Sequence, residues 1–127
     1  VTMTYPSDRS ASTNSVGNAE VQFENDTWVT AEKTTPALQS YEDMLEYEKG
    51  YSGDVGYQLS ESTYNGRKCM VMMHDGADNN DYEAEIEIVV YDDDGSSVAI
   101  HVSTLNEPLS SILANTDLMA TATHVTW

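Results

Sequence analysis

The sequence has few cations, one cysteine and no long apolar run. Only 5 of its 127 residues are Lys or Arg, against 22 Asp and Glu, so the net charge is -17. A chain this acidic repels the phosphates of nucleic acids and anionic membrane surfaces, which excludes nucleic acid as an expected partner. Because no run of about 18 apolar residues is present, we expect no membrane-embedded segment.

The single cysteine, Cys69, excludes an intrachain disulfide and a zinc site built from several cysteines. It lies within an apolar segment, where a small buried side chain is the expected role. A chain of 127 residues is long enough to fold around one hydrophobic core without a metal or a disulfide. We therefore predict a single domain over residues 1-127.

The clearest fold signal is a hairpin over residues 57-74. Asn65-Gly66 separates two runs rich in strand-forming residues, and this pair favours the two positive φ values of a type I′ turn. Such a turn sets a register in which Leu59 pairs with Met72. The second strand is apolar on both faces, so we predict that it is interior and that the first strand lies nearer an edge.

A second register can be predicted around the turn Asp93-Asp94-Gly95. A three-residue turn with Gly95 in the left-handed conformation pairs Ile88 with Ile100 and keeps the apolar residues on one face. A two-residue turn would instead place Ile88 opposite His101 and mix polar with apolar residues. The favoured register also places Glu87 opposite His101 on the other face.

The remaining helices and strands are predicted from the periodicity of apolar residues and from residues typical of helix ends and turns. Thr35-Pro36 indicates the start of an amphipathic helix that ends at Lys49-Gly50, and Asn106 indicates the start of a second, short helix. Further strands are predicted at 1-5, 21-23, 28-31 and 118-127, with loops at 7-19 and 75-81. The predicted fold is α+β, with an antiparallel sheet built from hairpins, one main amphipathic helix and a second short helix packed on it.

The histidines give no recognisable site. His74, His101 and His124 stand alone on different predicted strands, without the close spacing of a zinc-ligand pair. Glu87 and His101 could form an acid-base dyad, but the sequence shows no nucleophile or pocket beside them. We therefore predict a protein that is not an enzyme and that needs no cofactor.

The acidic side chains are either solvated surface charges without a ligand or, alternatively, ligands of a calcium ion. Carboxylate and amide oxygens are the ligands that calcium takes, six to eight at a time. Two acidic segments supply them, Asp75, Asp78, Asn80 and Asp81 in the first and Asp92, Asp93 and Asp94 in the second. Neither segment matches the EF-hand pattern, and acidic loops are usually only solvated.

The order of the parts resembles the PsbP-like fold. The resemblance is carried by the opening VTMTYPSD, the helix YEDMLEY, the strand and turn TYNGRKCMVMM and the late segment VAIHVSTLNEPLSSIL. This fold is shared by an extrinsic photosystem II subunit, a Ran-binding nuclear import factor and many small bacterial envelope lipoprotein domains. The resemblance implies a non-enzymatic adaptor or binding domain, often with metal or protein partners, and it carries over no catalytic residue.

Composition and resemblance together favour one function and leave two alternatives open. We expect a non-enzymatic binding or interaction module, extracellular or in a bacterial cell envelope, whose partner is a protein or a small ligand. The start at Val1 rather than Met fits a secreted protein, or a lipoprotein domain anchored upstream of Val1. The alternatives are a calcium-stabilised structural domain and an acidic inhibitor of a basic enzyme or toxin.

Overall fold

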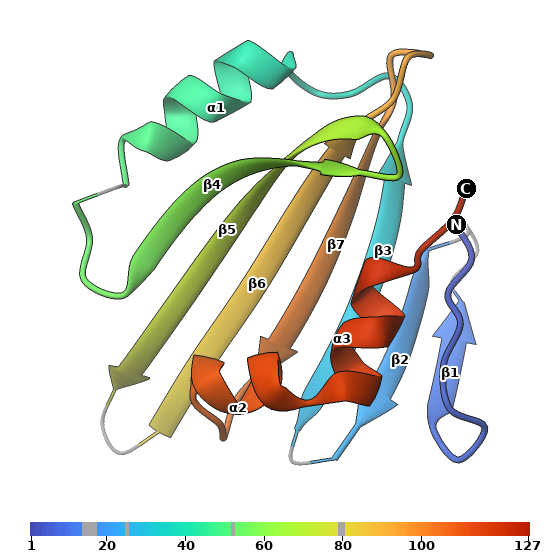
Figure 1. The fold of residues 1–127 in the computed structure, drawn as a ribbon, viewed down its shortest axis with the longest axis vertical. Coiled ribbons are helices and arrows are strands. Elements are labelled where there is room, and N and C mark those ends of the chain that lie inside the picture. The colour runs from blue at the N-terminus through green and yellow to red at the C-terminus, as the bar shows by residue number, and fades with distance from the viewer. Residues whose placement is uncertain (14–17, 25, 52, 79–80) are drawn as a thin grey trace.

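The computed structural model describes residues 1-13, 18-24, 26-51, 53-78 and 81-127. Across these residues, seven strands form one antiparallel sheet in the order β1-β2-β3-β7-β6-β5-β4 (Figure 1). The strands are β1 (Ser10–Thr13), β2 (Ala19–Phe23), β3 (Thr27–Thr34), β4 (Tyr57–Tyr64), β5 (Arg67–Asp78), β6 (Asp81–Tyr91) and β7 (Ser97–Thr104). The helices are α1 (Tyr41–Lys49), α2 (Leu109–Ala114) and α3 (Thr116–Thr123).

One face of the sheet carries the main hydrophobic core. Helices α2 and α3 lie over this face, where α3 packs on β3 and β7 (Figure 1). Ile112 of α2 and Leu118 of α3 are completely buried against the sheet. Their partners are apolar strand residues that point to the same face and are at most 1% exposed, namely Val21, Val29, Ile86, Val90, Ile100 and Val102.

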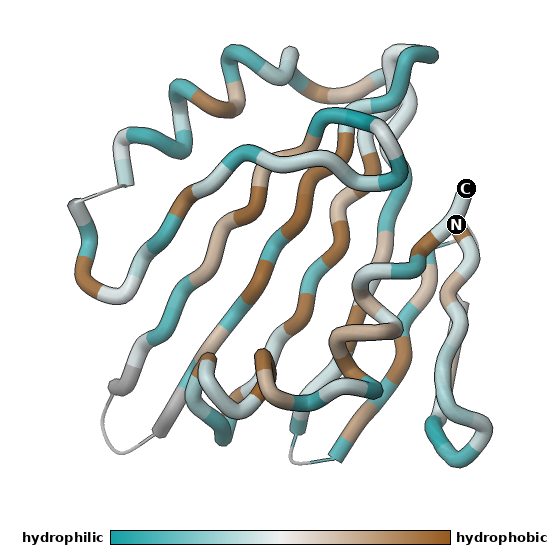
Figure 2. The backbone as a smooth tube through the Cα atoms, in the orientation of Figure 1, coloured by the Kyte–Doolittle hydropathy of each residue, from teal (hydrophilic) through white to brown (hydrophobic). Residues whose placement is uncertain are grey.

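The opposite face carries a smaller core under α1. Met70, Met72 and Val89 of β5 and β6 are buried there, and the hydrophobic side of α1 packs on them. The helix itself has no buried residue, and its outward side is hydrophilic, as Figure 2 shows. Helix α1 is therefore held on the sheet by a thin layer of contacts.

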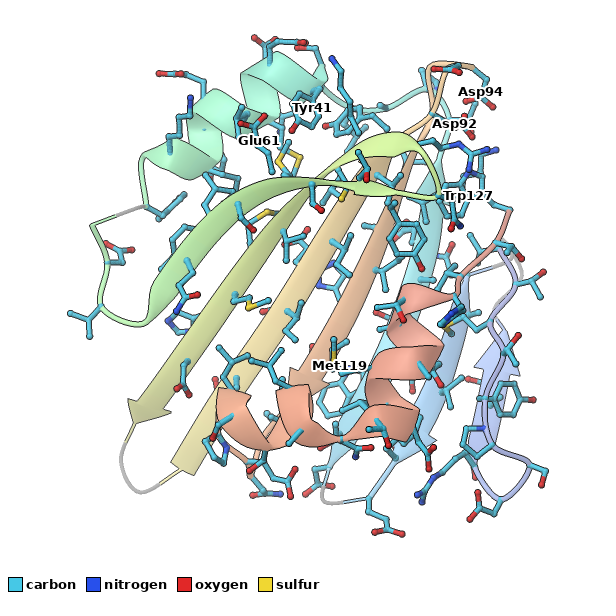
Figure 3. All side chains as sticks on the ribbon, viewed as in Figure 1. Tyr41, Glu61, Asp92, Asp94, Met119 and Trp127 are labelled. Carbon is cyan, nitrogen blue, oxygen red and sulfur yellow. The ribbon has the colours of Figure 1, made fainter. Side chains whose placement is uncertain are left out.

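Tyrosines provide much of that layer. The Tyr41 ring meets the Tyr91 ring edge-on with centroids 5.4 Å apart, and its hydroxyl donates to Glu61 Oε1 at 2.7 Å. Figure 3 shows Tyr41 and Glu61 side by side. Burial, together with the Glu61 hydrogen bond, raises the pKa of Tyr41 to about 12. Tyr41 therefore stays a neutral donor over the physiological pH range.

The predicted fold class is wrong in its balance of elements. Strands make up 46% of the described structure and helices 20%, so the fold is dominated by the sheet rather than by a main amphipathic helix. The reason is that β5 is apolar on both faces and β6 and β7 each give one apolar face to the main core, whereas α1 contributes only one weak stripe. The main core is covered instead by α2, which was predicted as a short helix, and by α3, which was not predicted as a helix.

Both predicted hairpin registers are confirmed. Leu59 pairs with Met72, and Asn65 and Gly66 have φ values of 51° and 79°, as a type I′ turn requires. Strand β5 is interior and β4 is an edge strand, also as predicted. In the later hairpin, Ile88 pairs with Ile100 and Glu87 with His101, while Gly95 has a φ of 84°.

The predictions for the two chain ends are wrong. Residues 1-5 form no regular strand, and Thr2 instead makes an isolated bridge with Thr126, while β1 lies within the predicted loop at 7-19. The predicted last strand contains helix α3. Asn115 begins this helix by accepting a hydrogen bond from the Leu118 amide at 3.1 Å, and Leu118, Ala122 and Val125 have helical spacing and are buried.

The helix starts also differ from their prediction. Helix α1 begins at Tyr41, because Ser40 rather than Thr35 caps it by accepting from the Asp43 amide at 3.1 Å. Its end before Gly50 is as predicted. Helix α2 begins at Leu109, and the Leu109 amide donates to the Asp75 side chain at 3.2 Å, so Asn106 is not its cap.

We expect Asn65→Val to destabilise the protein, because a β-branched residue at a φ near 51° is strained in the turn that sets the β4-β5 register. A loss of about 1 kcal/mol or more should lower the thermal unfolding midpoint by several degrees. Asn65→Gly, which tolerates this φ, is the control and should change the midpoint much less. A midpoint of Asn65→Val within about 2 °C of the wild type would contradict the argument.

Candidate functional site

The second face of the sheet is only partly covered. Helix α1 lies over β4, β5 and β6, and beyond it the alternate residues of β2, β3 and β7 reach the surface. The strand registers align polar side chains in rows on this face. We call it the open face and define it by Glu20, Gln22, Trp28, Thr30, Glu32, Glu85, Glu87, His101 and Ser103.

His101 connects two glutamates on the open face. Its Nδ1 lies 2.8 Å from Glu85 Oε1, and its Nε2 lies 3.6 Å from Glu87 Oε1. Glu85 and Glu87 are two residues apart in β6 and so point to the same side, while β7 places His101 directly opposite Glu87. These three residues, the His101 cluster, are between 27% and 47% exposed.

The cluster changes the proton affinity of its members. The hydrogen bond to Glu85 raises the pKa of His101 and lowers the pKa of Glu85. Burial raises the pKa of Glu87, and the charge of Glu85 acts in the same direction. The cluster is therefore a place where negative charge is concentrated and a cation is favoured.

A small cavity adjoins the cluster between α1 and the sheet. Its volume is about 80 Å³, and its lining includes Glu48, Tyr57, Glu85 and Glu87. The Tyr57 hydroxyl donates to Glu48 Oε2 at 2.7 Å and ties the end of α1 to β4. A third carboxylate therefore belongs to the same cavity as Glu85 and Glu87.

A second hollow lies on the other side of His101. It has a volume of about 320 Å³ and is lined by Glu20, Thr30, Glu32 and His101, together with residues near β1. His101 thus separates two recesses of the open face. Both recesses have carboxylates in their walls.

The first predicted calcium segment is mostly strand. Asp78 pairs with Asp81 in the β5-β6 ladder, which contradicts the predicted loop at 75-81. The Asp75 carboxylate accepts a hydrogen bond from the Leu109 amide and so positions α2. Asn80 and the side chains of Asp78 and Asp81 lie outside the part of the chain that the structure describes.

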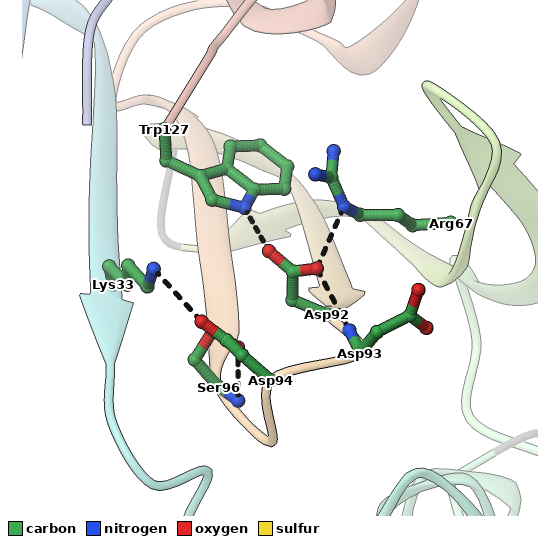
Figure 4. Close-up of polar contacts among 7 residues, drawn as sticks. All are labelled: Lys33, Arg67, Asp92, Asp93, Asp94, Ser96 and Trp127. Atoms are coloured by element: carbon green, nitrogen blue, oxygen red, sulfur yellow. Dashed lines mark hydrogen bonds and ion pairs between the residues drawn. The ribbon is translucent and has the colours of Figure 1, made fainter.

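The second predicted segment, Asp92-Asp93-Asp94, forms the β6-β7 turn (Figure 4). Asp92 accepts hydrogen bonds from Trp127 Nε1 at 2.8 Å and Arg67 Nε at 3.0 Å. Asp94 accepts from the amide and hydroxyl of Ser96 and pairs with Lys33 Nζ at 3.5 Å. Two of the three carboxylates are thus turned toward protein donors, and a calcium ion here stays a prediction.

Sequence reasoning found two members of the His101 cluster and missed the third. The predicted register placed Glu87 across from His101 and Glu85 on the same face, but the diagonal contact between Glu85 and His101 was not predicted. The signal was present, because Glu85 and Glu87 share a strand face. The only cysteine, Cys69, belongs to the main core on the opposite face, so its thiol is not available to this cluster.

Comparison with models of known protein families found no match, and comparison with curated proteins found no significantly similar sequence. The PsbP-like resemblance therefore remains a prediction, and no relative points to catalysis. Among the helices that the structure describes, none is long and apolar enough to cross a membrane.

We expect the turn carboxylate Asp92 to make stability depend on acid pH. The hydrogen bond from Trp127 lowers the pKa of Asp92 below its ordinary value of 3.8. The stability that the ionised carboxylate contributes is thus present above the unfolded-state pKa and is lost as pH falls through the folded-state pKa. Asp92→Asn should lower the unfolding midpoint at pH 7 and flatten its fall between about pH 5 and about pH 2.

The neighbouring substitution Asp93→Asn is the matched control, since the Asp93 amide, and not its carboxylate, bonds to Asp92. It should leave the acid transition close to that of the wild type. Equal flattening in both variants would show that the turn responds to net charge rather than to the Asp92 contacts.

For the acidic segments we predict a response to ionic strength rather than to calcium itself. Screening of like charges should raise the unfolding midpoint equally in calcium and magnesium at matched ionic strength. The double variant Asp93→Asn with Asp94→Asn should keep that response. A specific site would add about 2.7 kcal/mol at a hundred times its dissociation constant. A rise of more than about 4 °C that only calcium produces, abolished by changing one segment, would contradict the prediction.

Proposed function

We propose that this chain is a non-enzymatic binding module whose open face receives a positively charged segment of another protein. The observation that carries the proposal is an acidic sheet face left uncovered beside α1. Glu20, Glu32, Glu85 and Glu87 all belong to this face. Complementary charge directs such a partner to the face and speeds its association.

Most of the few cations of the chain are engaged elsewhere, which supports the proposal. Four of them pair with carboxylates that are not on the open face. These pairs are Arg9–Glu24 at 3.0 Å, Lys33–Asp94 at 3.5 Å, Arg67–Asp92 at 3.0 Å and Lys68–Glu42 at 3.8 Å. Among the ion pairs of the described residues, the open-face glutamates meet only His101, so their field is available to a basic partner.

Trp28 gives the face an aromatic anchor. It lies in β3 next to Ser103 of β7 and Gln22 of β2, and it is partly exposed. An indole ring is the aromatic surface that best attracts Lys and Arg cations. A partly exposed tryptophan on a sheet face that also carries glutamates therefore favours a basic, arginine-containing segment over a purely apolar one.

The expected location, extracellular or in a bacterial cell envelope, is part of this proposal and is supported by composition. An acidic inhibitor of a basic enzyme or toxin would be a special case of the same module, because it would use the same charge complementarity. The general module and the inhibitor differ in their partner, which is a basic structural protein in the first case and a basic enzyme or toxin in the second.

We expect an oligoarginine peptide to bind at physiological salt and to lose affinity when the open face is reversed in charge. Glu20→Lys with Glu32→Lys should weaken binding by about tenfold or more, which corresponds to about 1.4 kcal/mol. The measurement is calorimetric titration at about 0.15 M salt, where charges more than about 8 Å away are largely screened.

The matched control is Glu46→Lys with Asp54→Lys, which changes the net charge by the same amount at two exposed positions in and after α1. It should weaken binding by less than about threefold, because screening limits its reach. Equal losses in the two double variants would show that the peptide senses net charge only. Absence of binding to the unchanged protein would overturn the proposed function.

A further inference from the structure

We propose that the His101 cluster is a zinc site in which His101 Nε2 and Glu87 are ligands and Glu85 holds the imidazole in place. This inference goes beyond the binding of a basic partner and does not depend on it. The ligand atoms of the three side chains all lie within 4.8 Å of one another.

The separation between His101 Nε2 and Glu87 Oε1 fits a shared ion better than a direct contact. At 3.6 Å it is too long for a hydrogen bond. Zinc binds imidazole nitrogen and carboxylate oxygen at about 2.0 to 2.2 Å, so two of its tetrahedral ligands lie roughly 3.4 Å apart. An ion between these atoms therefore requires little movement of either side chain.

The other imidazole nitrogen is already in the arrangement that metal-binding histidines use. His101 Nδ1 lies 2.8 Å from Glu85 Oε1, so its proton is donated to that carboxylate. This fixes the tautomer in which the Nε2 lone pair faces Glu87. A carboxylate that accepts from the non-ligating nitrogen orients the ring and makes it a better ligand.

A further carboxylate and a small cavity lie beside Glu87. Glu48 of α1 lines the same cavity as Glu87, and the cavity of about 80 Å³ has room for water ligands. One imidazole with carboxylates suits zinc, which accepts four ligands, better than calcium, which takes six to eight oxygens. Strands β6 and β7 are interior strands of the sheet, so the ligands are held on a rigid support.

The test is titration of the metal-free protein with zinc alone, by calorimetry and by competition with a chromophoric chelator. We expect one equivalent to bind. His101→Gln and Glu87→Gln should each weaken binding by about a hundredfold or more, and Glu85→Gln by about ten- to a hundredfold. His124→Gln and Glu46→Gln, two exposed positions away from the cluster, are the controls and should leave the affinity within about threefold.

A nitrogen NMR spectrum of the imidazoles in the unchanged protein gives a readout that does not depend on whether a variant folds. Zinc should shift His101 Nε2 strongly while Nδ1 keeps its proton. Three results would each overturn the proposal. The first is a zinc-induced shift at His74 or His124 instead of His101, and the second is an unchanged zinc affinity in His101→Gln. The third is weak binding of several zinc ions whose affinity falls as much in Glu46→Gln as in the cluster variants. Because no basic peptide is present, these results leave the proposed partner binding to its own test.

Discussion

The structure depends on the antiparallel pairing of β6 with β7. These strands lie inside the sheet, and their register aligns Ile88 with Ile100 on the main core face. The same register necessarily aligns Glu87 with His101 on the other face, because side chains alternate along each strand. A shift by one residue would turn the core residues outward and separate the polar cluster, so the core and the site are specified by one constraint.

The two faces of the sheet are covered with unequal strength. Helices α2 and α3 bury leucine and isoleucine side chains completely, whereas α1 has no buried residue and relies on tyrosine contacts such as Tyr57 with Glu48. Glu48 faces the same cavity as Glu87, so the weakly held helix also forms one wall of the candidate site. Opening of α1 would cost less than loss of the main core and would change the exposure of that cavity.

Local chemistry made the hairpins predictable, and long-range packing made the ends unpredictable. Asn65-Gly66 and Gly95 specify their turns through φ alone, and alternation then fixes the pairing around them. The segment after Asn115 alternates like a strand and also repeats like a helix, so only its burial against the sheet decides that it is α3. For the candidate site, the opposed pair could be predicted from the register, but Glu85 required the diagonal geometry of a twisted sheet.

Strand β4 is the last strand of the sheet, and its outer backbone edge is a place where a second copy of the protein could add a strand. Residues 60-63 in this strand are Ser, Glu, Ser and Thr, all exposed. The chain also carries a net charge of -17, so two copies approaching edge to edge repel one another before their backbones can pair. The acidity on which the proposed binding of a basic partner rests therefore also protects the sheet from aggregation with itself.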